Sequence, residues 1–270
     1  MTVRERLLEI SELNIAEILL QMREVQLDEY IESLNSFVEN LPEREKELKE
    51  AFTEKDYFSF SKYLVDIKDI LVDIHADELA EECLKQINSL GNTKHEKIEA
   101  FLTYFLSLMA MLSIDIQMAA YKDEQDTEKT AQELQNSEHQ AGQKSILAVD
   151  DNAFFLDTLK QALKDTGHKL SCVLSGAEAL KFLQKHIPDL FILDIEMPEM
   201  NGYELAYKIR ELGKQAPIIF LTGNATPEYV TKALQAGAAD FIVKPVTQKY
   251  VVERVNRGLG LGLLRSPSVE

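Results

Sequence analysis

The sequence predicts two domains: an all-α, antiparallel four-helix bundle with an extra N-terminal helix, and an α/β domain with a doubly wound, five-stranded parallel sheet. In residues 1–121, apolar residues recur with a helical period almost throughout, which is typical of a bundle. From residue 144 onward, short apolar runs alternate with helix-period segments, which indicates a parallel sheet covered on both faces. The charge changes too: residues 1–143 hold 14 Lys+Arg and 31 Asp+Glu, whereas residues 144–270 hold 15 of each. At 270 residues, the chain is long enough for two separate cores.

The bundle is predicted to begin with a helix over Arg4–Met22 and to continue through four further helices. Pro42 precedes the acidic stretch EREKE and marks the start of a helix, since proline and acidic residues both favour the first turn. Ser89–Asn92 contains a glycine and marks a helix end. A long apolar helix, Ile98–Tyr121, completes the domain. The predicted core stripes contain Leu7, Ile10, Leu13, Ile18, Leu19, Tyr30, Ile31, Leu34, Phe37, Val38, Leu41, Leu48, Phe52, Leu79, Ala80, Cys83, Leu84, Ile87, Phe101, Leu102, Phe105, Leu106, Met109 and Leu112.

The stretch YLVDIKDILVDIHADEL, residues 63–79, is predicted to be one helix that leads into a second. Val65 and Val72 lie outside both of its patterned faces and are expected to be partly exposed. The core-facing stripe contains Leu64, Ile67, Ile70, Leu71 and Ile74. A separate acidic face contains Asp66, Asp69, Asp73 and Asp77. Two exposed valines beside a row of aspartates need an explanation.

Residues 122–143 are polar and are predicted to form an exposed tether between the domains. The second domain is predicted over residues 144–260, with a glycine-containing frayed tail over residues 261–270. Its predicted strands are Ile146–Val149, Leu170–Leu174, Leu190–Leu193, Ile218–Leu221 and Phe241–Val243. Its predicted helices are Phe154–Lys164, Gly176–Lys185, Gly202–Leu212, Pro227–Gln235 and Val246–Arg257.

Polar residues follow four of these predicted strands. Asp150 and Asp151 end the first strand, Asp194 the third, Thr222 the fourth, and Lys244 the fifth. The carboxyl ends of parallel strands meet at one edge of a sheet, so these side chains are expected to converge. Three carboxylates together favour a hard divalent cation such as Mg2+ or Mn2+. One carboxylate can then attack phosphorus to form an acyl phosphate, with the lysine and the hydroxyl stabilising the transferred group.

Residues 144–260 resemble the receiver domain of bacterial response regulators. The resemblance is carried by ILAVDDN, PDLFILDIEMPEMNGYEL, PIIFLTGNA and GAADFIVKPV. It implies a flavodoxin-like sheet of order 2-1-3-4-5, with Asp194 as the phospho-acceptor. It also implies metal binding by Asp150, Asp151, Asp194 and the main-chain carbonyl of Glu196.

The same resemblance assigns roles around the phosphoryl group. Thr222 and Lys244 match the residues that sense it, and a cis peptide is expected at Lys244–Pro245. Phe241 matches an aromatic that swings inward when Thr222 moves, although simple core packing also explains a strand aromatic. Glu196 departs from the small or neutral residues common at its position, so its carboxylate is expected to change the rate of dephosphorylation.

Residues 1–121 resemble a histidine-phosphotransfer domain, through EYIESLNSFVENLPEREKELKEAF and DYFSFSKYLVDIKDILVDIHADELAEECLKQI. In this alignment Lys68 matches the family pattern, but Val65 occupies the histidine position and Asp69 a glycine position. The resemblance therefore implies a degenerate domain, recast as a docking surface that includes Val65, Lys68, Asp69 and Val72. The alternative is that the valines pack beneath the N-terminal helix and that the acidic face only aids solubility.

Two other histidines offer a rival function. In this hypothesis the bundle is an active phosphotransferase that uses His75 or His95, although packing, helix capping or a solvated surface position also explains them. A third hypothesis makes the second domain a silent scaffold, which the complete set of strand-end residues opposes. The sequence of the bundle shows no paired metal ligands and no glycine-rich phosphate loop.

Composition restricts the partners and the compartment. The net charge of −17 repels nucleic acid and anionic membranes, so a protein partner is expected. Cys83 and Cys172 are predicted to be reduced thiols of a cytoplasmic protein, because they form no metal-ligand pattern. No run approaches about 18 uninterrupted apolar residues, and no signal peptide is predicted.

The combined interpretation is a cytoplasmic response regulator rather than an enzyme with an external substrate, since it would catalyse only its own phosphorylation and dephosphorylation. A histidine kinase or small phosphodonor would supply the phosphoryl group. Output would be protein contact rather than DNA binding, and the sequence leaves homodimerisation open.

Overall fold

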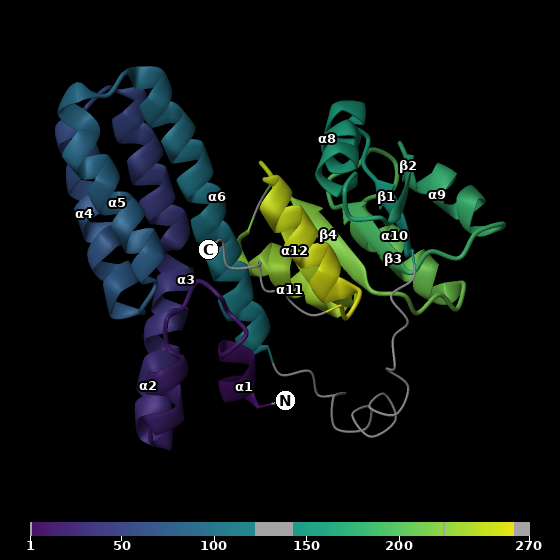
Figure 1. Ribbon diagram of the computed structural model, residues 1–270, viewed down its shortest axis with the longest axis horizontal. Coiled ribbons are helices and arrows are strands. Elements are labelled where there is room, and N and C mark those ends of the chain that lie inside the picture. The colour runs from purple at the N-terminus through teal and green to yellow at the C-terminus, as the bar shows by residue number, and fades with distance from the viewer. Residues whose placement is uncertain (1, 122–142, 224, 262–270) are drawn as a thin grey trace, which may run out of the picture. The chain divides into compact units, whose positions relative to one another are not determined.

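The computed structural model describes residues 2–121, 143–223 and 225–261. It contains two compact units, which Figure 1 shows. The N-terminal unit is all-α, and the C-terminal unit is a five-stranded parallel sheet with flanking helices. The predicted fold class is confirmed. The predicted tether and tail lie almost wholly outside the described residues.

Four helices form the N-terminal bundle. They are α3 (Glu24–Thr53), α4 (Tyr57–Asp73), α5 (Asp77–Ser89) and α6 (His95–Ala120), with the 3-10 helix η1 (Leu90–Asn92) between the last two. Short connections make consecutive helices antiparallel neighbours, and α3 packs against both α4 and α6. The predicted helix end at Ser89 is confirmed. The largest fully buried side chains of the bundle include Leu34, Leu48, Phe60, Leu64, Leu71 and Phe105.

Pro42 lies inside α3, so the prediction that it starts a helix is wrong. Proline lacks the N–H that would bond to the carbonyl four residues earlier, and in a helix interior it costs about 3 kcal/mol. Leu34, Leu41 and Leu48, on both sides of the proline, are at most 4% exposed. Burying one leucine contributes about 1.5–3 kcal/mol, so the continuous core stripe offsets the local cost.

The extra N-terminal helix is in fact two short helices, α1 (Val3–Leu7) and α2 (Ala16–Gln21). Between them the backbone N–H of Asn14 donates to the carbonyl of His75 at 2.8 Å, and the chain buries Ile10, Leu13 and Ile15. A continuous helix would not place all three on one face. The tertiary contacts of this linking segment therefore replace a helix.

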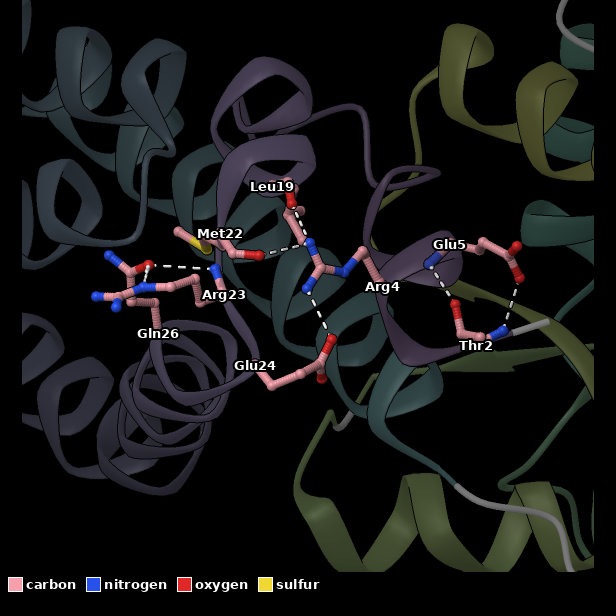
Figure 2. Close-up of polar contacts among 8 residues, drawn as sticks. All are labelled: Thr2, Arg4, Glu5, Leu19, Met22, Arg23, Glu24 and Gln26. Carbon is pink, nitrogen blue, oxygen red and sulfur yellow. Dashed lines mark hydrogen bonds and ion pairs between the residues drawn. The ribbon is translucent and has the colours of Figure 1, made fainter.

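Two arginines hold this segment against the bundle. Arg4 donates to the carbonyls of Leu19 and Met22 at the end of α2 and pairs with Glu24 at 3.2 Å, as Figure 2 shows. Arg6 donates from Nε to the carbonyl of Ala119 at 2.9 Å, near the end of α6. Helix ends leave carbonyls without intrahelical partners, and these guanidinium groups satisfy three of them.

Several details of the bundle differ from the sequence predictions. Ile18 and Leu84 are 39% and 47% exposed, so their placement in the core is wrong. Among the described residues, α6 alone is long and apolar enough to cross a membrane, but 72% of its most apolar 18-residue stretch is buried, as in a core helix. Cys83 and Cys172 are free thiols, and burial raises the pKa of Cys83 to about 12.

The sheet of the C-terminal unit has the order β2-β1-β3-β4-β5, and all of its strand pairs are parallel. The predicted order is therefore confirmed. The strands are β1 (Ser145–Val149), β2 (Lys169–Val173), β3 (Leu190–Asp194), β4 (Ile218–Thr222) and β5 (Ala238–Val243). β1, β3 and β4 are almost wholly buried, as expected for central strands covered on both faces.

Helices α8 (Ala153–Leu163) and α12 (Gln248–Gly258) pack together over one face of the sheet. Helices α9 (Gly176–Leu183) and α10 (Gly202–Glu211) pack against each other and against the sheet. Tyr203 of α10 contacts Phe220 of β4. Helix α11 (Pro227–Gln235) connects β4 to β5. Because the strands are parallel, all five carboxyl ends meet at one edge, where the candidate site lies.

Candidate functional site

Three aspartates come together at the carboxyl edge of the sheet. Asp150, Asp151 and Asp194 each offer an oxygen, and these oxygens lie within 4.8 Å of one another. Asp150 and Asp194 are 0% and 5% exposed, whereas Asp151 is exposed to solvent. Carboxylate oxygens this close repel one another and suit a hard divalent cation such as Mg2+, which keeps several of its waters. The predicted convergence of the three aspartates is confirmed.

Lys244 reaches the same point from the end of β5. Its Nζ lies 2.7 Å from Oδ2 of Asp150 and 3.0 Å from Oδ1 of Asp194. Burial alone would lower the pKa of Lys244, but the hydrogen bonds to these carboxylates raise it above its ordinary value. The lysine is therefore a fixed positive charge beside the candidate phospho-acceptor.

Asp194 is a weaker acid than an ordinary aspartate. Burial raises its pKa to about 6, against the lowering effect of Lys244 and with a further increase from Asp150 and Asp151. One ammonium group therefore does not neutralise the site, and a cation with two positive charges would stabilise the ionised carboxylate. The donor set fits the metal that the sequence predicts.

Thr222 and Phe241 belong to β4 and β5, two of the strands whose carboxyl ends form this edge of the sheet. Thr222 ends β4, is 2% exposed, and accepts a backbone hydrogen bond from Lys244 at 2.8 Å. Phe241 is 2% exposed, and its ring centroid lies 6.4 Å from that of Phe220. The predicted cis peptide at Lys244–Pro245 is confirmed. The buried Phe241 is compatible both with the inward position of a switch aromatic and with simple core packing.

The structure adds supporting residues that the sequence analysis missed. Asn152 caps α8 by accepting from the backbone N–H groups of Phe154 and Phe155, which fixes the turn that carries Asp150 and Asp151. The ring of Phe155 lies under Lys244, with Nζ 4.4 Å from the ring centroid, and so helps to orient the ammonium. An Asn directly before a helical pattern is a capping signal, so Asn152 was readable from the sequence, whereas the long-range contact of Phe155 was not.

Gly202 is a second residue that the sequence analysis missed. A Cβ at this position would lie 2.3 Å from the carbonyl oxygen of Asp194, and the Gly202 N–H donates to the Ile195 carbonyl at 3.0 Å. Only glycine permits α10 to begin this close to the acceptor strand. The loop that connects Asp194 to Gly202 therefore returns to the end of β3, next to the candidate site.

Comparisons with known proteins agree with this geometry. Residues 146–256 match the family model for the response regulator receiver domain. The chemotaxis protein CheY of Bacillus subtilis is 39% identical over 115 residues, which cover 42% of this chain and 96% of that protein. The chemotaxis protein CheY of Thermotoga maritima is 36% identical over 115 residues, with the same coverage of each chain. The response regulator protein TmoT of Ectopseudomonas mendocina is 33% identical over 125 residues, which cover 46% of this chain and 57% of that protein.

The chain belongs to the response regulator receiver family. The match lies wholly within the C-terminal unit, which we now call the receiver. Receivers generally bind Mg2+ through acidic residues, and the three-aspartate cluster occupies the corresponding edge of the sheet.

In the bundle, the structure places the predicted docking residues on one helix. Val65 and Val72 of α4 are 37% and 48% exposed, which confirms the expected partial exposure. The alternative that they pack beneath the N-terminal segment is wrong. Lys68 and Asp69 form an ion pair at 2.7 Å between them. Phe58, one heptad before Val65, is 82% exposed and extends the stripe that the sequence analysis identified only in part.

The two other candidate histidines have different surroundings. His75 has a φ of 59° in the turn after α4, and its carbonyl accepts from Asn14, so it is a turn residue. His95 begins α6, and its ring stacks on Phe52 with centroids 4.4 Å apart. Nδ1 of His95 lies 2.7 Å from the hydroxyl of Tyr57. Of the two, only His95 has a ring nitrogen engaged by another side chain.

Proposed function

We propose that the receiver accepts a phosphoryl group on Asp194 in a Mg2+- or Mn2+-dependent reaction, and that the protein signals by protein contact. The observation that supports this most directly is the convergence of Asp150, Asp151, Asp194 and Lys244 at one edge of the sheet. The family match and the likeness to a chemotaxis protein and to the response regulator protein TmoT support the phosphorelay role. A histidine kinase or a small phosphodonor would supply the group.

In the proposed reaction, an oxygen of Asp194 attacks phosphorus as the bond from phosphorus to the donor breaks, which gives an acyl phosphate. A bound metal ion would neutralise charge on the transferred group. Lys244 would pair with one phosphoryl oxygen, and the Thr222 hydroxyl would hydrogen-bond to another. Asp150 and Asp151 would hold the metal together with Asp194 and the main-chain carbonyl of Glu196. The protein would catalyse only its own phosphorylation and its reversal.

This proposal is tested by incubating the full chain with acetyl phosphate and Mg2+ and mapping the modified residue by mass spectrometry. The expected label lies on Asp194. It is not expected to form when the metal is chelated before the phosphodonor is added. Asp194→Asn is expected to reduce labelling at least about 100-fold, whereas the exposed control Asp165→Asn keeps it. Equal labelling of both variants would reject Asp194 as the acceptor and revive the silent-scaffold hypothesis.

For the output, we propose that the exposed stripe of α4 is a docking surface. Val65 and Val72 are its apolar centre, Lys68 and Asp69 lie between them as an ion pair, and acidic residues surround it. An apolar centre within a charged ring is typical of interaction sites, and the acidic ring favours a basic protein face over nucleic acid or membrane. This face corresponds to the proposed degenerate phosphotransfer slot.

Val65→Asp is expected to weaken association with a partner or with a second copy, while receiver labelling by acetyl phosphate stays unchanged. Val25→Asp is the matched control, because Val25 is 68% exposed on α3. Analytical ultracentrifugation of the phosphorylated and unphosphorylated chain gives the self-association, including any homodimer. Unchanged association in both states and unchanged kinase-dependent labelling would remove the docking role. We place the protein in the cytoplasm on the grounds of its kinase-linked family.

A second candidate function is phosphotransfer through the bundle, and the ring geometry of His95 favours it over transfer through His75. In the tautomer in which Nδ1–H donates to the Tyr57 hydroxyl, Nε2 keeps its lone pair and is the nucleophilic nitrogen. An acid-labile, base-stable phosphate on His95 that requires Asp194 would support this function. Its absence from a chain labelled on Asp194 would reject it.

A further inference from the structure

The exposed apolar side chains of α4 follow a heptad repeat. Phe58, Val65 and Val72 are all exposed and recur at every seventh residue, and we call them the heptad stripe. An α-helix drifts only about 20° per heptad, so the three side chains stay on one face. At about 1.5 Å per residue, the stripe is about 21 Å long. Since α4 packs against α3 and α5 through a different, buried stripe, the heptad stripe is accessible to a partner.

The spacing of the heptad stripe matches a helical partner better than a strand. Side chains at heptad spacing recur about every 10.5 Å along a helix, whereas side chains on one face of a strand recur about every 6.6 Å. Two helices with heptad-spaced apolar residues can therefore keep these residues in contact over successive repeats. Phe58 adds a large aromatic anchor at one end of the stripe.

The charge around the heptad stripe favours a basic partner. Helical spacing places the exposed Asp66, Asp69 and Asp73 along one side of the stripe, and we call these three residues the acidic flank. Residues 62–85, which include most of α4 and much of α5, contain seven Asp+Glu and three lysines. A partner helix that carries cations beside its apolar residues would therefore meet opposite charge.

Lys68 borders the heptad stripe on its other side. Burial raises the pKa of the Cys83 thiol of α5, and the charge of Lys68 opposes this increase, so Lys68 lies on the side next to α5. Its ammonium pairs with Asp69 at 2.7 Å. This single cation leaves the excess of negative charge around the stripe in place.

We propose that α4 binds an amphipathic, basic helix of another protein, which lays heptad-spaced apolar residues along the heptad stripe. Lys or Arg beside those residues would pair with the acidic flank. A second copy of this chain would bring the same negative charge to the contact, so like charges would oppose self-association there. The inference rests on the docking role proposed for α4 and specifies the chemistry of its partner.

The test uses the full chain and two synthetic peptides of three heptads as probes. The lysine peptide has leucine at the two apolar positions of each heptad, lysine at the two flanking positions and glutamine elsewhere. The glutamate peptide has glutamate in place of each lysine. In fluorescence anisotropy titrations, the lysine peptide is expected to bind at least about tenfold more tightly, and its affinity is expected to fall as the salt concentration rises. Phe58→Ala is expected to weaken its binding about tenfold, as loss of an aromatic anchor implies.

Two further variants locate the binding on α4. Phe154→Ala removes an aromatic side chain of matched exposure, 81% against 82% for Phe58, from α8 of the receiver and is expected to leave the affinity unchanged. Replacement of the whole acidic flank by lysine (Asp66→Lys, Asp69→Lys and Asp73→Lys) is expected to reverse the preference, so that the glutamate peptide binds more tightly.

The outcomes separate this inference from the proposals on which it rests. Absence of binding by the lysine peptide, equal weakening by Phe154→Ala, or a preference that survives replacement of the acidic flank would overturn the inference. Equal binding of both peptides that Phe58→Ala abolishes would overturn it and keep α4 as a docking surface. Self-association in sedimentation that Phe58→Ala abolishes would assign the stripe to a second copy and also overturn it. Failure of Asp194 to label would concern the receiver alone.

Discussion

The two units of the protein use charged side chains in opposite ways. In the receiver, Asp150, Asp194 and Asp240 are at most 5% exposed, and each pairs with a lysine or an arginine. In the bundle, each described ion pair includes a side chain that is more than half exposed. Burying an ion costs several kcal/mol, whereas a surface pair contributes about 0–1 kcal/mol. The receiver therefore gives up stability to hold its charges at fixed buried positions, whereas the ion pairs of the bundle involve no such cost.

The difference shows which kind of residue determines the function of each unit. In the receiver, the positions of a few charges define a reaction site, and a change of one group alters its chemistry. In the bundle, Asp115 of α6 is buried, but the ion-paired charges lie at the surface and keep it hydrated, so specificity depends on which apolar side chains are left outside the core. Phe58, Val65 and Val72 are those side chains on α4. The predictions below test the contrast between buried and exposed positions.

The largest effect is expected at the buried ion cluster of the receiver. Oδ1 of Asp240 lies 3.1 Å from Nη1 of Arg254, and Oδ2 lies 2.6 Å from Nε of Arg257. These two ion pairs join β5 to α12. Asp240→Asn removes the carboxylate that pairs with the buried Arg254 and is expected to lower the free energy of unfolding by about 3–5 kcal/mol. In the bundle, Glu82→Gln breaks a surface pair with Lys85 and is expected to cost less than about 1 kcal/mol. Urea unfolding followed by circular dichroism compares the two; similar costs would contradict the contrast.

The next effect compares neighbouring apolar residues of α4. Leu64 is 0% exposed and Val65 is 37% exposed. Leu64→Ala opens a cavity in the core and is expected to cost about 2–5 kcal/mol. Val65→Ala is expected to change stability by less than about 0.5 kcal/mol. Thermal unfolding of the two variants decides whether α4 presents Val65 outward; a large cost for Val65→Ala would place it in the core and end its docking role.

Lys244 gives a pH-dependent prediction. The pKa of Asp194 is raised to about 6, so between the ordinary aspartate value and pH 6 the folded state holds a proton that the unfolded state has lost. Stability therefore falls as the pH rises through this window. Lys244→Met removes the positive charge that favours the carboxylate and is expected to raise the pKa of Asp194 by about one further unit, or about 1.4 kcal/mol.

Carbon-13 NMR of the Asp194 carboxyl in Mg2+-free protein measures this midpoint directly. Lys160→Met is the control, because Lys160 pairs only with Asp157 on the surface and its loss is expected to leave the midpoint in place. A midpoint at or below pH 6 in Lys244→Met would show that the lysine does not stabilise the ionised acceptor.

The sequence predicted the receiver site well because the signal is local to each strand end. Asp150, Asp194 and Lys244 each follow a short apolar run, and parallel topology alone brings them together. Helix α10 and strand β3 were predicted within one residue of their bounds. Phe155 was missed because its contact with Lys244 joins residues far apart in the sequence and depends on how α8 packs.

The bundle was predicted less well because helical periodicity does not state what covers a stripe. Leu84 has core spacing but is 47% exposed, and Pro42 has the features of a helix start but lies within α3. The single helix over Arg4–Met22 failed for the same reason, since contacts with His75 and with helix ends outweigh local propensity. Val65 was read correctly because it lay outside both faces of its helix.

The smallest effect is expected at the aromatic cluster of His95. Tyr57→Phe removes the hydroxyl that contacts Nδ1 of His95 and keeps the ring. Loss of this half-buried hydrogen bond is expected to cost about 1 kcal/mol and to speed hydrogen exchange in the first turn of α6. Tyr63→Phe, on the same helix, is the control and is expected to leave that exchange unchanged.

The same variant distinguishes the two roles of His95. If His95 only packs, Tyr57→Phe changes the exchange rate and leaves the phosphorylation pattern of the chain as it was. If His95 transfers phosphoryl groups in the tautomer whose Nδ1–H donates to Tyr57, loss of the hydroxyl permits the other tautomer, in which Nε2 carries the proton and is no longer a nucleophile. The acid-labile label on His95 is then expected to fall about twofold or more while the label on Asp194 rises, since both tautomers of a free imidazole are populated. A label on His95 that is indifferent to Tyr57 would show that the ring contact serves packing alone.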